Sequence, residues 1–200
     1  MTDLFQEKAQ DWDVNDMVKA LSIGIGSAIL DNVALDESMQ VMDFGAGTGL
    51  ITAQVANRVG KVTAVDVSEA MLEKLAAKDE LSGKVEIVCQ NIIEQPIGIE
   101  FDLIVSAMAM HHVEDTDKMI ECFAEHLKPG ARVALADLDE EDGSFHPEDA
   151  KGVYHSGFNR ETFLGKLETH GFKDIRFMTA HIASKEEKIY PIFLALASKA

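Results

Sequence analysis

The sequence predicts an α/β fold organised around a mostly parallel β-sheet. Short apolar runs alternate along the chain with segments whose apolar residues recur at helical spacing, which is the pattern of βαβ units. The chain has 200 residues, of which 46% are hydrophobic, and this suffices for one domain with a buried core. We therefore expect a single domain over residues 1–200, in which residues 1–35 form a helical N-terminal cap.

The first half of the chain is expected to contain four strands and two helices. Each strand is an apolar run, and each helix carries apolar residues on one face, as Ile51, Val55 and Val59 do. Ser68 can cap the second helix through its hydroxyl group. In chain order these elements are the strand 40–44, the helix 50–58, the strand 62–66, the helix 69–78 and the strands 84–89 and 101–106.

The second half is expected to contain two helices and three strands. One helix runs through Met119 and Phe123 to Leu127, and a Pro-Gly pair marks its end. Asn159 can cap the other helix, which reaches residue 170. The strands are 131–138, 174–182 and 190–197. Because no helix separates the last two strands, they should form an antiparallel hairpin.

The composition excludes several classes of protein. The 35 acidic residues against 18 basic ones give a net charge of −17, which repels phosphate backbones, so we expect no nucleic-acid partner. No apolar run is long enough to span a bilayer, and the first residues do not form a secretory signal. We therefore expect no membrane insertion and a cytoplasmic location. Cys89 and Cys122 have no metal-like spacing and are expected to be buried free thiols.

A glycine-rich turn follows the first strand and indicates a ligand site. Asp43 ends the apolar run, and Gly45, Gly47 and Gly49 alternate after it. Glycine tolerates positive φ and lets a ligand approach the backbone, and open α/β sheets bind ligands at this end of a strand. A dinucleotide fingerprint would place its third glycine at position 50, which is Leu50. The acid before the turn suits a ligand with an ammonium group better than a pyrophosphate.

Asp66 strengthens this interpretation. It ends the second strand, where an acid can accept hydrogen bonds from both hydroxyls of a ribose. An aspartate here could also merely cap the next helix. Two acids at the ends of neighbouring strands, on either side of a glycine turn, favour a nucleoside ligand.

Four motifs in order resemble those of the class I S-adenosylmethionine (SAM)-dependent methyltransferases. The similarity is greatest to the small-molecule type that includes the ubiquinone and menaquinone C-methyltransferases, and it covers about residues 39–137. The motifs are DFGAGTG at 43–49, VDVSEAML at 65–72, FDLIV at 101–105 with HHV at 111–113, and LKPG at 127–130.

The resemblance implies a Rossmann-like three-layer sandwich with seven strands in the order 3-2-1-4-5-7-6, strand 7 being antiparallel. It implies methyl transfer from SAM to a small-molecule acceptor, with S-adenosylhomocysteine as the product. Asp43 would help hold the amino group, Asp66 the ribose, and Val67 and Met71 the adenine. Asn91 stands where the family usually has aspartate, and its carbonyl oxygen can still accept a hydrogen bond. The full expected set is Asp43, Gly45, Ala46, Gly47, Gly49, Asp66, Val67, Met71, Asn91, Ile92 and Ser106.

The residues that could act on the acceptor follow the fourth and fifth strands. The candidate catalytic residues are His111, His112, His146 and His155. Each histidine could instead fix a loop or lie in solvent. The loop 139–157 and the segment around Trp12 are expected to close over the acceptor.

Three alternatives stay open on the sequence alone. Asp137, Asp139, Asp142 and His146 could hold a metal, but metal-dependent relatives place an acid where this chain has Ser106, so we expect none. The chain could be a SAM-binding sensor or a non-catalytic subunit with the same fold. An NAD-linked oxidoreductase is disfavoured by Leu50.

Overall fold

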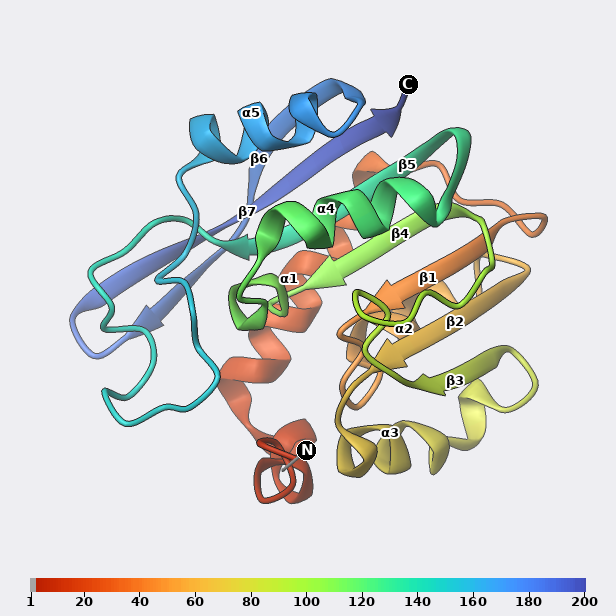
Figure 1. The fold of residues 1–200 in the computed structure, drawn as a ribbon. Coiled ribbons are helices and arrows are strands. Elements are labelled where there is room, and N and C mark those ends of the chain that lie inside the picture. Colours follow the sequence, from red (N-terminus) through yellow and green to blue (C-terminus); the bar gives the residue numbers. More distant parts are fainter. Residues whose placement is uncertain (1–2) are drawn as a thin grey trace.

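The computed structural model describes residues 3–200, and a seven-stranded sheet runs through it (Figure 1). The strand order is β3-β2-β1-β4-β5-β7-β6, as the resemblance implies. Strands β1 to β5 are parallel, and β7 runs antiparallel to both β5 and β6. The strands are β1 (Gln40–Phe44), β2 (Lys61–Asp66), β3 (Val85–Cys89), β4 (Phe101–Ala107), β5 (Leu127–Leu138), β6 (Phe172–Lys185) and β7 (Lys188–Lys199).

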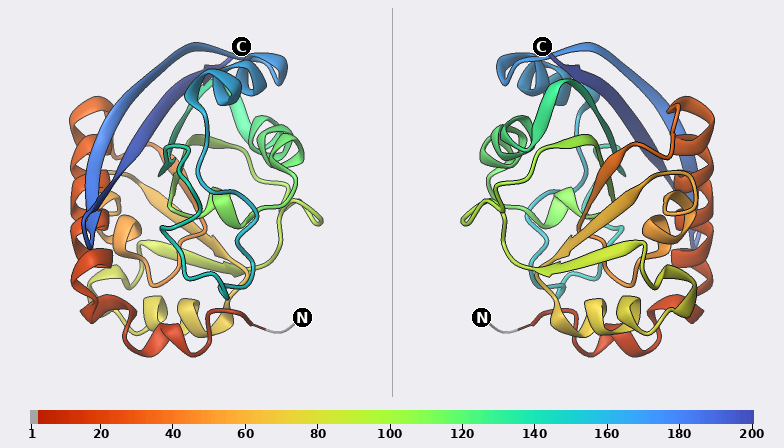
Figure 2. Two further views of the ribbon diagram at one scale, coloured as in Figure 1. Left: turned by 90° about the vertical axis from the view of Figure 1, so that its left-hand side faces the viewer. Right: turned by 90° about the vertical axis from the view of Figure 1, so that its right-hand side faces the viewer.

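Helices cover both faces of this sheet (Figure 2). The α-helices are α1 (Asp16–Asn32), α2 (Leu50–Val55), α3 (Glu69–Ala76), α4 (Thr116–Glu125) and α5 (Arg160–Thr169). Short 3-10 turns are η1 (Lys8–Gln10), η2 (Trp12–Val14), η3 (Asp79–Leu81) and η4 (Met110–His112).

The hydrophobic core has two halves, one on each face of the sheet. Successive residues of β1 point to opposite faces, so Val41 belongs to one half and Met42 to the other. The first half includes apolar residues of α1, α2 and α3, and the second includes those of α4 and α5. This gives the three-layer sandwich that we expected.

Side-chain caps fix where several helices begin. The hydroxyl of Ser68 accepts from the backbone N–H of Met71, and Asn159 accepts from that of Thr162. Both caps are confirmed. Asn15 does the same at the start of α1, where its carbonyl oxygen accepts from two backbone N–H groups.

The main error of the sequence prediction lies between α4 and β5. Leu127 does not end the helix but begins the strand, where it pairs with Phe101 of β4. The backbone N–H of Phe101 donates to the carbonyl of His126 at 2.8 Å, so pairing with β4 begins directly after α4. The final hairpin is antiparallel as expected, but both of its strands are longer than the apolar runs that predicted them.

Cys89 also differs from the prediction, because it is exposed whereas Cys122 is buried. Strand β3 is the edge of the sheet, and no helix lies between β3 and β4. The outer edge of β3 is therefore not paired with another strand.

None of the helices within residues 3–200 has the length and apolar character needed to cross a membrane.

Replacing Phe123 with alanine is expected to lower the free energy of unfolding by about 3–5 kcal/mol. The ring is fully buried and packs edge-on against Phe44, with 4.9 Å between ring centroids. Urea denaturation measures the loss. The control Ile23→Ala, at a side chain of α1 that is 65% exposed, should stay within about 0.5 kcal/mol of the wild type. Equal losses for the two variants would contradict the packing described for α4.

Candidate functional site

A glycine loop leaves β1 at its carboxyl end and folds back against β2. Gly45, Gly47 and Gly49 all have positive φ, at 69°, 53° and 83°. The backbone N–H groups of Gly45 and Ala46 donate to the carbonyl of Val65, at 2.9 and 3.0 Å. These bonds hold the loop beside the end of β2, where the sequence placed the second acid.

The loop is closely packed at two glycines and open at the third. A Cβ at Gly45 would lie 2.3 Å from the Cβ of Ala109, and one at Gly49 would lie 2.7 Å from Cγ of Leu75. A Cβ at Gly47 would have no neighbour within 4 Å among the described residues. A ligand can therefore approach the backbone at Gly47, which is where the nucleoside ligand was expected.

The carboxylate of Asp66 joins this loop to the start of α3. One oxygen accepts from the backbone N–H of Gly47 at 2.7 Å, and the other accepts from that of Ser68 at 2.8 Å. Burial raises the pKa of Asp66, and the two backbone hydrogen bonds act in the opposite direction. Each carboxylate oxygen has a second lone pair, so the group can still accept from ligand hydroxyls.

Asp43 lies behind the loop rather than on its open face. Its side chain is almost fully buried and accepts a hydrogen bond from the hydroxyl of Thr52 at 2.6 Å. Burial raises the pKa of Asp43 to about 7, and the charge of nearby Asp66 adds to this effect. The direct contact of Asp43 with the amino group of a ligand stays a prediction.

The other expected cofactor residues differ in their exposure. Val67 is exposed and Asn91 is partly exposed, whereas Ala46 and Gly49 in the loop and Met71 in α3 are buried. The carbonyl oxygen of the Asn91 side chain accepts from the backbone N–H of Ile93 at 3.2 Å, which leaves it one lone pair.

Two members of the expected set have no surface to offer. Ile92 belongs to the core, and the fully buried hydroxyl of Ser106 donates to the carbonyl of Phe44 at 2.9 Å. Their expected contact with the ligand stays a prediction. Ser106 ties β4 to β1 at the end of the sheet that carries the loop.

Three of the four candidate histidines gather at the ends of β4 and β5. His111 and His112 belong to η4, after β4, and His146 comes from the loop after β5. The ring centroid of His111 lies 4.1 Å from that of His112 and 4.9 Å from that of His146. We call these three side chains, together with Asp137, the histidine cluster.

Hydrogen bonds order the cluster into a chain. Nδ1 of His111 lies 2.7 Å from a carboxylate oxygen of Asp137, and Nε2 of His111 lies 3.1 Å from Nε2 of His146. His112 turns away and donates through Nδ1 to the carbonyl of Gly152 at 2.6 Å. Burial lowers the pKa of His112 and of His146 to about 4 each, so both rings are neutral at pH 7.

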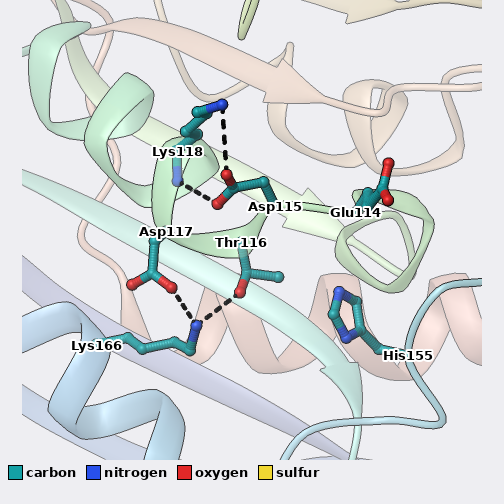
Figure 3. Close-up of a pocket in the computed structure, with 7 residues that line it drawn as sticks. All are labelled: Glu114, Asp115, Thr116, Asp117, Lys118, His155 and Lys166. Carbon is teal, nitrogen blue, oxygen red and sulfur yellow. Dashed lines mark hydrogen bonds and ion pairs between the residues drawn. The ribbon is translucent and has the colours of Figure 1, made fainter.

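His155 does not join this chain. Its Nε2 donates to the carbonyl of Val113 at 2.9 Å, and its ring packs beside Phe158. It faces a polar recess at the start of α4, in which Lys166 donates to Thr116 and Asp117 (Figure 3). His155 therefore lies apart from the other three histidines, and its catalytic role stays a prediction.

The acids of the metal alternative are held apart from one another. Asp139 pairs with both donors of Arg160 at 2.7 Å, and Asp142 pairs with Lys188 at 2.7 Å. Asp137 is bonded to His111. Within residues 3–200, no three histidine, cysteine or acidic side chains converge on a point that could hold a metal ion.

The N-terminal segment lies across the glycine loop and reaches the histidine cluster. Asp13 accepts from the hydroxyl of Thr48 and pairs with Lys78 at 2.7 Å. Phe5 packs edge-on against both Trp12 and His112, with 6.2 and 5.1 Å between ring centroids. Figures 1 and 2 show this segment beside the start of α3. The expectation that the Trp12 segment lies near the active site agrees with this arrangement.

Asp3, Phe5 and Asp13 were not identified from the sequence. Asp3 accepts from the hydroxyl of Ser68 at 2.9 Å, and the two residues are 65 positions apart in the chain. Isolated acids and aromatic residues in a polar segment carry no periodic signal, so only the fold reveals these contacts.

Comparisons with known proteins agree with this geometry. A methyltransferase domain model matches residues 41–130. YrrT of Bacillus subtilis, an uncharacterized methyltransferase, is 30% identical over 178 residues, covering 84% of this chain and 81% of YrrT. The ubiquinone/menaquinone biosynthesis C-methyltransferase UbiE of Idiomarina loihiensis is 32% identical over 154 residues, covering 70% of this chain and 59% of UbiE.

Solved structures share the fold. The putative methyltransferase of Haloferax volcanii, in its complex with the Trm112 activator, superposes with a TM-score of 0.79 at 15% identity, over 99% of this chain and 98% of that one. The chain spans about three fifths of the length of the first curated relatives that it matches.

Asp43→Asn is expected to stabilise the protein at pH 8 and not at pH 4. Asparagine keeps an acceptor for the Thr52 hydroxyl and removes the buried charge. Because the folded-state pKa of about 7 lies above the ordinary 3.8, ionisation of Asp43 opposes folding. The wild type therefore loses stability relative to the variant as pH rises from about 4 to 7, by about 1–4 kcal/mol in total. Urea denaturation across this pH range measures the difference, and a gap that widens toward low pH would contradict the account.

Proposed function

This chain belongs to the class I SAM-dependent methyltransferases, and we propose that its acceptor is a small molecule that binds at the histidine cluster. Family membership supports an enzyme that uses SAM as the methyl donor, and it argues against the NAD-linked alternative. The identity of the acceptor pocket and of the residues around SAM is our proposal.

The glycine loop suits SAM in two respects. The open side of Gly47 admits a ligand against the backbone, and Asp66 has lone pairs for the hydroxyls of a ribose. We propose that Gly45 and Gly47 line the methionine part, that Asp66 holds the ribose, and that Val67 and Asn91 line the adenine. When bound, SAM supplies an electrophilic methyl group on a sulfonium.

The observation that carries the acceptor proposal is the position of the histidine cluster relative to the loop. The parallel strands β1, β2, β4 and β5 have their carboxyl ends on the same side of the sheet (Figure 1). The loop after β1 therefore lies on the same side as His111 and His146. The N-terminal segment touches both, through Asp13 at the loop and Phe5 at the cluster. An acceptor site covered in this way suits a small molecule.

The negative charge of the chain supports the same conclusion. A net charge of −17 disfavours a polyanionic acceptor such as nucleic acid. Half-buried neutral imidazoles and an aromatic ring line the cluster, and such surroundings suit a small, partly apolar molecule.

The test of the proposed function is turnover. The protein should bind SAM in calorimetry and release S-adenosylhomocysteine when a panel of small phenols, hydroxy acids, amines and carbon acids is added. We expect product with at least one of these acceptors. Binding of SAM without product from any of them would favour the sensor or non-catalytic subunit instead.

Gly47→Ala is expected to weaken SAM binding at least tenfold while costing about 1–2 kcal/mol of stability from its positive φ. The added methyl group would project into the open side of the loop, where residues 3–200 place no atom within 4 Å apart from those of the adjoining residues in the chain. Gly83→Ala is the matched control, because Gly83 also has a positive φ of 76° and open space around it. Calorimetry should show wild-type SAM affinity for the control, and equal losses for the two variants would argue against the proposed cradle.

A further inference from the structure

On the basis of the proposed function, we infer that Nδ1 of His146 accepts a proton from the methyl acceptor, and that His111 and Asp137 are positioning residues that fix this atom in its acceptor state. The acceptor therefore belongs to the class of molecules whose reacting oxygen or carbon carries a proton that must be lost. Tertiary amines and thioethers carry no such proton, so their methylation does not require a proton acceptor of this kind.

The protonation states of the His111 and His146 rings follow from the hydrogen bonds of Asp137. Its two oxygens accept from three N–H groups: the backbone and Nδ1 of His111, at 3.1 and 2.7 Å, and the backbone of Leu138, at 2.8 Å. Nδ1 of His111 is therefore the protonated nitrogen, and its Nε2 carries a lone pair. Nε2 of His146, 3.1 Å away, must donate to that lone pair. The neutral ring of His146 then carries its remaining lone pair on Nδ1.

The first two members of the chain are rigid. His111 and Asp137 are both buried, and Asp137 pairs with Phe193 of β7 near the end of β5. Both the backbone N–H and the ring of His111 are hydrogen-bonded to Asp137, so the ring cannot turn without losing its bond to the carboxylate. A ring fixed in this way imposes one tautomer on its neighbour.

The charges around His146 suit a transient proton acceptor. The groups that face it are His111, His112, Asp137, Lys8 and Lys185. Burial and the neighbouring cations keep the pKa of His146 low, so that the ring is neutral before reaction, while the Asp137 carboxylate stabilises the imidazolium that forms. An interaction of this kind acts on the transition state more than on the ground state.

The X–H bond of the acceptor breaks, its proton goes to Nδ1 of His146, and its electron pair forms the new bond to the methyl carbon. The bond from that carbon to sulfur breaks with its electrons on sulfur, which leaves neutral S-adenosylhomocysteine. His146 releases the proton to solvent after the product leaves.

The tautomers can be measured without knowing the acceptor. In the full chain labelled with ¹⁵N-histidine, NMR at pH 7 should show His111 protonated at Nδ1 and His146 protonated at Nε2. Asp137→Asn removes the charged acceptor and should reduce the share of both tautomers. A His146 ring protonated at Nδ1 in the wild type, or tautomers unchanged in Asp137→Asn, would overturn the inference.

Turnover gives the second readout. With an acceptor from the panel, His146→Gln should lower turnover by about 10²- to 10⁴-fold and leave SAM affinity within twofold. Added imidazole should restore part of the activity of His146→Ala. The control His170→Gln alters a histidine of the same type that pairs with Asp117, away from the cluster, and should behave as wild type.

The outcomes separate the two proposals. Absence of SAM binding, or of turnover, in the wild-type protein contradicts the proposed function. Normal SAM binding and turnover that is unaffected by His146→Gln contradicts only the role of His146. Preference for a tertiary amine or a thioether as acceptor contradicts the inferred substrate class.

Discussion

The parallel register of β1, β2, β4 and β5 is the constraint on which the whole site depends. Neighbouring parallel strands end at one edge, so Phe44 stands beside Val65 and Ser106, and Ser106 stands beside Leu135. The residues that follow these strands therefore meet, although they are far apart in the sequence. The carboxyl ends of these strands carry the glycine loop, the carboxylate of Asp66 and the histidine cluster. The helices keep the strands buried on both faces.

A carboxylate at the end of a strand fixes each half of the site. Asp66 holds the open glycine loop through Gly47, and Asp137 holds the turn that carries His111. Both carboxylates accept backbone N–H groups, which fixes the backbone locally. Asp43 shows the cost of this design, because burial opposes its ionisation and therefore opposes folding at neutral pH.

Features with a local cause could be predicted from the sequence, and features with a distant cause could not. The strand 40–44, the glycine turn and the caps Ser68 and Asn159 depend on neighbouring residues, and they were right. The end of α4 was wrong because pairing with β4 overrides the helical pattern. His146 and His155 look equivalent in the sequence, and only contacts with His111 and Val113 distinguish them.

The most direct test of the account is a crystal structure of the protein with S-adenosylhomocysteine bound. The ligand should lie along Gly45 and Gly47 with its ribose hydroxyls on Asp66, and its sulfur should face the space in front of His146. A ligand in the polar recess beside Lys166, or a sulfur separated from the histidine cluster by the glycine loop, would contradict the claim that donor and proton acceptor share one edge of the sheet.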